Sequence, residues 1–208
     1  MKAKKSPIQR TILKGTNITA VADGLNTSII SAGQFSEFGS VKSFFQAPQM
    51  AVVDFGKYSF FVQVDQRKAL ANDNSGDLTS NSPVRSMMKR FLQDSAGLRL
   101  SAVGFNFTFE SILDVPLADF LRETYLQGES IGRFGKSFQS FGFKLTVVRT
   151  DCLLQISVDP IWQNPTTALV VLNFHHEPPG PDISSRLVEM YGTLVGEAPG
   201  IVDQIFSR

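Results

Sequence analysis

The sequence predicts an α+β fold, in which a largely antiparallel sheet carries three to four helices packed mainly on one face. Segments in which apolar residues alternate with polar ones follow each other across short turns, which is typical of antiparallel strands. Stretches with apolar residues at helical spacing interrupt these strands and then follow the last one. The chain has 208 residues, of which 42% are hydrophobic and 19% are charged, so it can build a sizeable core. We predict one α+β domain over 1–208, with a flexible basic tail at about 1–7.

The clearest strand signals in the first half of the chain begin at residue 50. Residues 50–55 are apolar except for Asp54 and are followed by Gly56, and residues 58–65 alternate, so two antiparallel strands are expected there. A weaker signal predicts another strand at 16–21. Residues 71–82 (ANDNSGDLTSNS) are small and polar, and we expect them to form an exposed loop.

A helix is expected directly after this loop. Ser82 is a suitable N-cap, Pro83 suits the first helical turn, and Gly97 suits the end. The apolar residues of this helix fall on one stripe: Val84, Met87, Met88, Phe91 and Leu92. A second helix is expected from Asp114 to near Gly128.

Phenylalanine is unusually abundant, with 18 residues against one Trp and three Tyr. In the strand expected at 98–110, strict alternation places Phe105, Phe107 and Phe109 on one face. Because phenylalanine has no polar atom to hydrogen-bond, this face is predicted to line the core.

The segment 130–145 (SIGRFGKSFQSFGFKL) contains partial matches to two nucleotide-binding motifs. Residues 135–137 (GKS) match the end of a phosphate-binding loop, but Ser130 stands where that loop requires glycine, and a strand follows where a helix is required. Residues 141–143 (FGF) match part of the aromatic strand of RNA-recognition domains, but the flanking positions do not match. We therefore do not predict nucleotide binding by residues 135–137 or RNA binding by residues 141–143.

A core-facing strand explains residues 141–143 better than an RNA-binding strand does. Alternation places four residues on one face, which indicates a core face: Phe141, Phe143, Leu145 and Val147. Three residues before this strand are out of phase with it and stay candidates for an exposed aromatic and basic group: Phe134, Lys136 and Phe138.

Strands are expected at 141–149, 152–159 and 166–175. Asp182 can cap a following helix, and 197–207 has the pattern of a last helix.

Candidate catalytic residues are few. Cys152 is the single cysteine, which excludes intrachain disulfides, and it shares a face with apolar residues, so we expect a small buried side chain. His175 and His176 are adjacent on a strand and therefore point to opposite faces, so they cannot easily converge on one metal or substrate. We predict no catalytic, cofactor-binding or metal-binding residue, and a His-dependent hydrolase is the least favoured alternative.

The leading hypothesis is a non-catalytic binding or assembly protein that acts through protein–protein contacts and self-associates. Ile161 and Trp162 lie in the Pro-bounded loop 159–165 and are the candidate partner contacts, because aromatic residues dominate interface hot spots. The same Trp could instead fold back over the core. The N-terminus is basic with no apolar stretch after it, and no run of about 18 apolar residues occurs, so a cytoplasmic protein without a membrane span is expected.

Nucleic-acid binding is the alternative. The chain has 20 basic and 19 acidic residues and lacks the cationic excess that such binding usually requires. Under this alternative, the contacts would come from one helix face and from the segment before residue 141: Arg85, Lys89, Arg90, Arg133 and Lys136.

Overall fold

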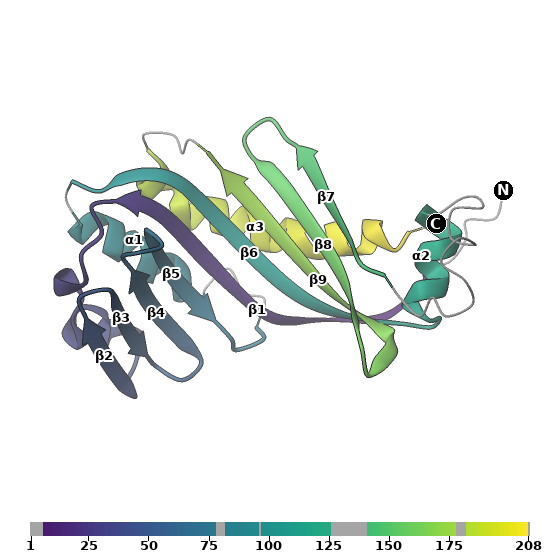
Figure 1. Cartoon of the computed structure of the whole chain (residues 1–208), viewed down its shortest axis with the longest axis horizontal. Coiled ribbons are helices and arrows are strands. Elements are labelled where there is room, and N and C mark those ends of the chain that lie inside the picture. The colour runs from purple at the N-terminus through teal and green to yellow at the C-terminus, as the bar shows by residue number, and fades with distance from the viewer. Residues whose placement is uncertain (1–5, 78–81, 96, 126–140, 178–181, 208) are drawn as a thin grey trace.

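The computed structural model of the chain describes residues 6–77, 82–95, 97–125, 141–177 and 182–207. Its strands form one antiparallel sheet in the order β2-β3-β4-β5-β1-β6-β9-β8-β7 (Figure 1). The strands are β1 (Ile8–Asp23), β2 (Ser43–Ala47), β3 (Met50–Asp54), β4 (Tyr58–Gln63), β5 (Lys68–Asp73), β6 (Arg99–Leu113), β7 (Phe143–Val148), β8 (Leu153–Ile161) and β9 (Asn164–His176). The helices are α1 (Val84–Asp94), α2 (Leu117–Tyr125) and α3 (Ile183–Ile205), with 3-10 helices η1 (Thr27–Ile29) and η2 (Ala32–Phe38).

The predicted α+β class and the antiparallel sheet are confirmed. Helices α1 and α3 lie against the same face of the sheet, with α3 running lengthwise behind β6, β9 and β8 (Figure 1). The sheet therefore has one covered face and one open face. Each strand of such a sheet is expected to alternate apolar residues toward the helices with polar residues toward solvent.

The covered face of the central strand β6 is the aromatic face that the sequence predicts. Phe105, Phe107 and Phe109 are at most 2% exposed. The Phe107 ring stands edge-on to Phe174 of β9 and stacks on Tyr191 of α3, with ring centroids 5.9 Å apart in both pairs. Aromatic packing between sheet and helix therefore fixes α3 over the middle of the sheet.

Two strands differ from the sequence prediction. Strand β1 runs from Ile8 to Asp23 and is longer than the strand expected at residues 16–21, because it pairs along most of its length with β6. The expected loop at 71–82 begins later, since residues 71–73 complete β5 and Asp73 is 3% exposed. Pairing of residues 71–73 with β1 on one side and β4 on the other outweighs their low strand propensity.

A buried polar network replaces the expected cap of helix α1. The Ser82 hydroxyl donates to the Asp73 carboxylate instead of capping the helix, whose N-cap is Pro83. Nearby, Thr16 of β1 and Tyr191 of α3 join their hydroxyls at 2.9 Å. Burial raises the pKa of Tyr191. These bonds satisfy polar groups in the interior where α1, α3, β1 and β5 meet.

The two expected C-terminal helices are one helix. Helix α3 continues through Pro199, although proline removes a backbone donor. Its buried face continues on both sides of the proline, with Val195, Ala198 and Val202 at most 7% exposed. Packing of this face against the sheet therefore outweighs the local cost of proline.

The apolar residues of edge strand β7 are less buried than the sequence predicts. Its Leu145 and Val147 point to the helix side, as predicted, but both are 44% exposed, and Phe143 is only partly buried. Helix α3 passes behind the lower part of β7 as well as behind the interior strands (Figure 1), yet Leu145 and Val147 stay partly exposed because β7 has a neighbouring strand on one side only. The apolar face of this edge strand is therefore only partly buried. Residues 1–5 of the predicted tail and Phe134, Lys136 and Phe138 lie outside the described residues, whereas Pro7 accepts a hydrogen bond from the Asp114 backbone.

The packing of Phe107 gives the first prediction. Phe107→Ala is expected to lower the free energy of unfolding by about 3–5 kcal/mol, because it opens a cavity between β6, β9 and α3. Phe45→Ala serves as the control, since Phe45 is 52% exposed and its loss is expected to cost less than about 1 kcal/mol. Urea denaturation followed by circular dichroism measures both. Equal costs for the two variants would contradict the packing described.

Candidate functional site

A row of polar, almost entirely uncharged side chains crosses the open face of the sheet. Strand register places one such residue on each strand at the same level, so that each pairs with the next. From β7 to β2 the row is Thr146, Gln155, Asn173, Asn106, Asn17, Asn72, Ser59, Asp54 and Ser43. We call these residues the polar row. Only Asp54, near the far edge, carries a charge.

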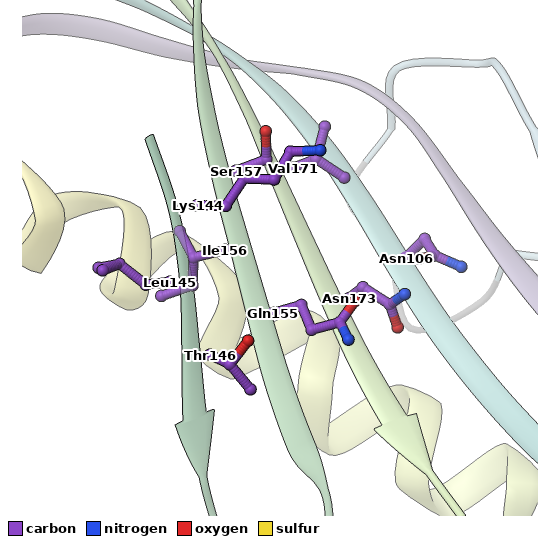
Figure 2. Close-up of a pocket in the computed structure, with 9 residues that line it drawn as sticks. All are labelled: Asn106, Lys144, Leu145, Thr146, Gln155, Ile156, Ser157, Val171 and Asn173. Atoms are coloured by element: carbon purple, nitrogen blue, oxygen red, sulfur yellow. The ribbon is translucent and has the colours of Figure 1, made fainter. Parts of the chain in front are cut away.

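The β7 end of the polar row lies in a concavity of about 350 Å³. Figure 2 shows Thr146, Gln155, Asn173 and Asn106 on four adjacent strands of this wall, with Lys144 farther along the strands near Ser157 and Val171. The remaining lining residues are Ser157 and Val171 on the open face and Leu145 and Ile156, which alternate to the covered face. The concavity is therefore polar and carries one positive charge.

The polar row is partly hydrogen-bonded to itself. Asn106 donates through Nδ2 to Asn17 Oδ1 at 2.7 Å, and Thr19 donates to the same oxygen at 3.2 Å. Asn72 donates weakly to Ser59 at 3.4 Å. These bonds join β6 to β1 and, separately, β5 to β4.

The Asn173 and Gln155 amides inside the concavity lack such side-chain hydrogen bonds within the described residues. Asn173 Oδ1 is buried and has no hydrogen-bond partner in the described part of the chain. Within the described residues, no side-chain hydrogen bond or ion pair engages Gln155, Thr146 or Lys144 either. Leaving a buried acceptor unpaired costs on the order of 1–3 kcal/mol, so this oxygen needs an explanation.

Gly104 on β6 keeps space beside these amides. A Cβ at this position would lie 3.3 Å from Asn173 Oδ1 and 3.7 Å from Asn106 Nδ2. A Cβ here would therefore crowd the Asn173 oxygen and make an ordinary contact with the Asn106 amide. The glycine leaves both groups room to reorient.

Ile161 and Trp162 lie at the turn between β8 and β9. The strands extend to Ile161 and resume at Asn164, which leaves a two-residue turn rather than the expected loop 159–165. Trp162 is 84% exposed, so it does not cover the core. An exposed tryptophan on a rigid hairpin is typical of a partner contact, and this role stays a prediction.

The two histidines point to opposite faces, as expected. His175 lies on the open face, where its Nε2 is 2.9 Å from Glu177. His176 lies on the covered face, edge-on to Phe105, and its Nδ1 donates to the Asp151 carbonyl at 3.0 Å. Because Nδ1 carries the proton, the buried Nε2 is an unprotonated acceptor, and it has no partner in the described residues.

Other candidate residues are accounted for by local packing. Cys152 is buried, as predicted, and desolvation raises the pKa of its thiol to about 11, which keeps it a poor nucleophile at neutral pH. On helix α1, Arg90 forms an ion pair with Asp94 at 2.7 Å, so that charge is already neutralised. Arg85 and Lys89 are half-buried on the same helix, and Arg133 and Lys136 lie outside the described residues. The nucleic-acid alternative therefore stays a prediction.

The polar row was not predicted from the sequence. The sequence does contain a signal for it: Asn is depleted in strands, yet Asn106 and Asn173 occur inside strongly patterned strands and Asn17 inside a weaker one. What joins them is the register, which depends on the pairing of strands far apart in the chain. Sequence periodicity alone does not contain that information.

Comparison with known proteins finds no match to a family model or to a curated protein. Among the described residues, no group of three or more His, Cys, Asp or Glu side chains could hold a metal ion. No helix within the described ranges has the length and apolar character needed to cross a membrane.

His176 gives a pH prediction. Burial lowers its pKa below the ordinary value of about 6.5, so the unfolded chain binds a proton at a pH where the folded chain does not. The free energy of unfolding is therefore expected to fall as the pH drops from about 6.5 to the folded-state pKa, and to level off below it.

The matched variants are His176→Asn, which keeps a donor for the Asp151 carbonyl but cannot titrate, and His175→Asn on the open face. Urea denaturation between pH 7.5 and 5 is expected to show a smaller loss of stability in His176→Asn than in the wild type and in His175→Asn. The same loss in all three proteins would contradict the assignment.

Proposed function

We propose that this protein is a non-catalytic assembly protein that binds a second copy of itself through edge strand β7. The observation that carries the proposal is the exposed apolar edge: Val148 is 80% exposed, and Leu145 and Val147 are 44% exposed. Lys144 is the only charged residue of the strand. An exposed, apolar edge strand is a template for pairing with another chain unless something covers or charges it.

The unpaired backbone groups of β7 can be assigned from its turn with β8. Arg149 donates its N–H to the Cys152 carbonyl, which makes these two residues a hydrogen-bonded pair. Hydrogen-bonded and non-hydrogen-bonded pairs alternate along an antiparallel ladder. The N–H and C=O groups of Lys144, Thr146 and Val148 therefore point away from β8, toward the free edge.

These groups suit antiparallel pairing of two β7 strands about a two-fold axis at Thr146. Thr146 then faces Thr146 of the second copy, and Lys144 faces Val148, so all outward-pointing backbone groups pair. On the helix side, Leu145 faces Val147 of the second copy and covers apolar surface that is exposed in the single chain. No two like charges face each other, and a two-fold contact closes on itself.

The opposite edge is less suited to the same role. Strand β2 exposes Phe44 and Phe45, but its Gln46 side chain donates to the carbonyls of Thr27 and Ile30. This bonding ties the strand to the segment around η1 and places other backbone beside it. We therefore assign self-association to β7 rather than to β2.

Replacing Thr146 by proline tests the proposal. Thr146→Pro removes one outward N–H while leaving the ladder with β8 intact, and proline is tolerated on edge strands in this orientation. Thr146→Val is the matched control, because it keeps the N–H and a β-branched side chain. Sedimentation equilibrium from low to high micromolar concentration is expected to show dimers for the wild type and for Thr146→Val, with at least about tenfold weaker association for Thr146→Pro.

Each outcome of this experiment is informative. A wild type that stays monomeric over the whole range contradicts self-association. A dimer that Thr146→Pro leaves unchanged, with a wild-type circular dichroism spectrum, places the contact elsewhere than β7.

Trp162 gives a second prediction about the same interface. The β8–β9 hairpin extends past Phe143, so in the two-fold arrangement it lies toward the Arg149 end of the second copy's β7. Trp162→Ala is expected to weaken dimerisation several-fold, and to change the free energy of unfolding by less than about 0.5 kcal/mol because the side chain is exposed. Phe45→Ala, an exposed aromatic on the other edge, is the control and should leave dimerisation unchanged. Equal effects of the two variants on dimerisation would show that Trp162 does not lie in the interface.

A further inference from the structure

We infer that the concavity on the open face binds a neutral, hydroxyl-rich ligand the size of a mono- or disaccharide. The site consists of the amides of Asn106, Gln155 and Asn173, the Thr146 hydroxyl and the Lys144 ammonium group (Figure 2). This inference goes beyond self-association and does not require it.

The unused hydrogen-bonding capacity of these residues defines the ligand. Asn173 Oδ1 is an unpaired acceptor and calls for a donor. The amide nitrogens of Asn173 and Gln155 and the Lys144 ammonium group are donors that call for acceptors. A hydroxyl group is donor and acceptor at once, so a ring that carries several hydroxyls meets both demands with one kind of group.

The spacing of the row also suits such a ligand. Adjacent strands lie about 4.8 Å apart, so Gln155, Asn173 and Asn106 present three amides at regular intervals along one line. Neighbouring hydroxyls of a sugar ring can bridge amides at this separation. The Val171 side chain beside them offers a small apolar contact for ring carbons.

Charge and size narrow the class further. The lining contains no carboxylate, and its one cation lies on edge strand β7, so nothing in the lining demands a highly charged ligand. A volume of about 350 Å³ is at the lower end of the range for small-molecule sites. Gly104 allows Asn173 to turn, so that its buried oxygen can exchange its present surroundings for a ligand hydroxyl.

Ordinary solvation of the open face is the competing explanation. Open faces of antiparallel sheets are polar in general, but Thr and charged residues serve that purpose without the low strand propensity of Asn. The Asn72 position separates the two explanations. Asn72 lies in the same row on β5 but outside the concavity. If the row serves only solvation, Asn72 and Asn173 should respond alike to added sugar, whereas ligand binding should affect Asn173 alone.

The test uses the intact chain and the methyl glycosides of glucose, galactose, mannose and N-acetylglucosamine, with maltose and cellobiose as disaccharides. Side-chain amide resonances of Asn and Gln are observed directly in ¹H–¹⁵N correlation spectra. At least one sugar is expected to shift the resonances of Asn106, Gln155 and Asn173 in a saturable manner, and to leave those of Asn72 unchanged.

Variants then assign the effect. Asn173→Ala and Gln155→Ala are expected to weaken binding at least about tenfold, and Asn72→Ala, the matched control, is expected to bind as the wild type does. Weak single-site binding is detectable at sugar concentrations up to about 50 mM. If no sugar produces saturable shifts in that range, the inference is overturned. Shifts produced by N-acetylglycinamide but by no sugar overturn it as well and identify an amide-bearing ligand instead.

Discussion

The burial of one aromatic face under a single long helix is the constraint on which the rest of this structure depends. Phe107 contacts both Phe174 and Tyr191, so β6, β9 and α3 share one packed layer at the centre of the sheet. Helices α1 and α3 both lie on this face, so the other face of the described sheet is open. Strand β7 ends the strand order and has a neighbouring strand on one side only, so its side chains stay partly exposed although α3 passes behind it.

Much of the covered face could be predicted from the sequence, because side-chain alternation and helical stripes are local. The aromatic face of β6 and the stripe of α1 are read from residues a few positions apart, and both are buried. Leu145 and Val147 show the limit of such reasoning. Their alternation gives the correct side of β7, but only the order of strands in the sheet shows that this strand is an edge.

The candidate sites depend even more on tertiary structure. The residue type of Trp162 makes it a candidate, whereas its exposure follows from the two-residue turn between β8 and β9, which is shorter than the expected loop 159–165. Asn17, Asn106 and Asn173 are separated by most of the chain and meet only through the pairing of β1, β6 and β9. A polar row across a sheet is a property of register, and register is set by the whole fold.

The two proposals meet at Thr146, which is both the centre of the proposed strand pairing and the last residue of the polar row. Pairing about Thr146 would place the two rows end to end, with the concavities of the two copies on either side of the axis. A ligand that contacted both halves would bind the dimer better than the single chain and would therefore stabilise the dimer by mass action. A ligand confined to one concavity would leave the association unchanged. The effect of a saturating sugar on the dimer dissociation constant thus distinguishes one continuous groove from two separate sites.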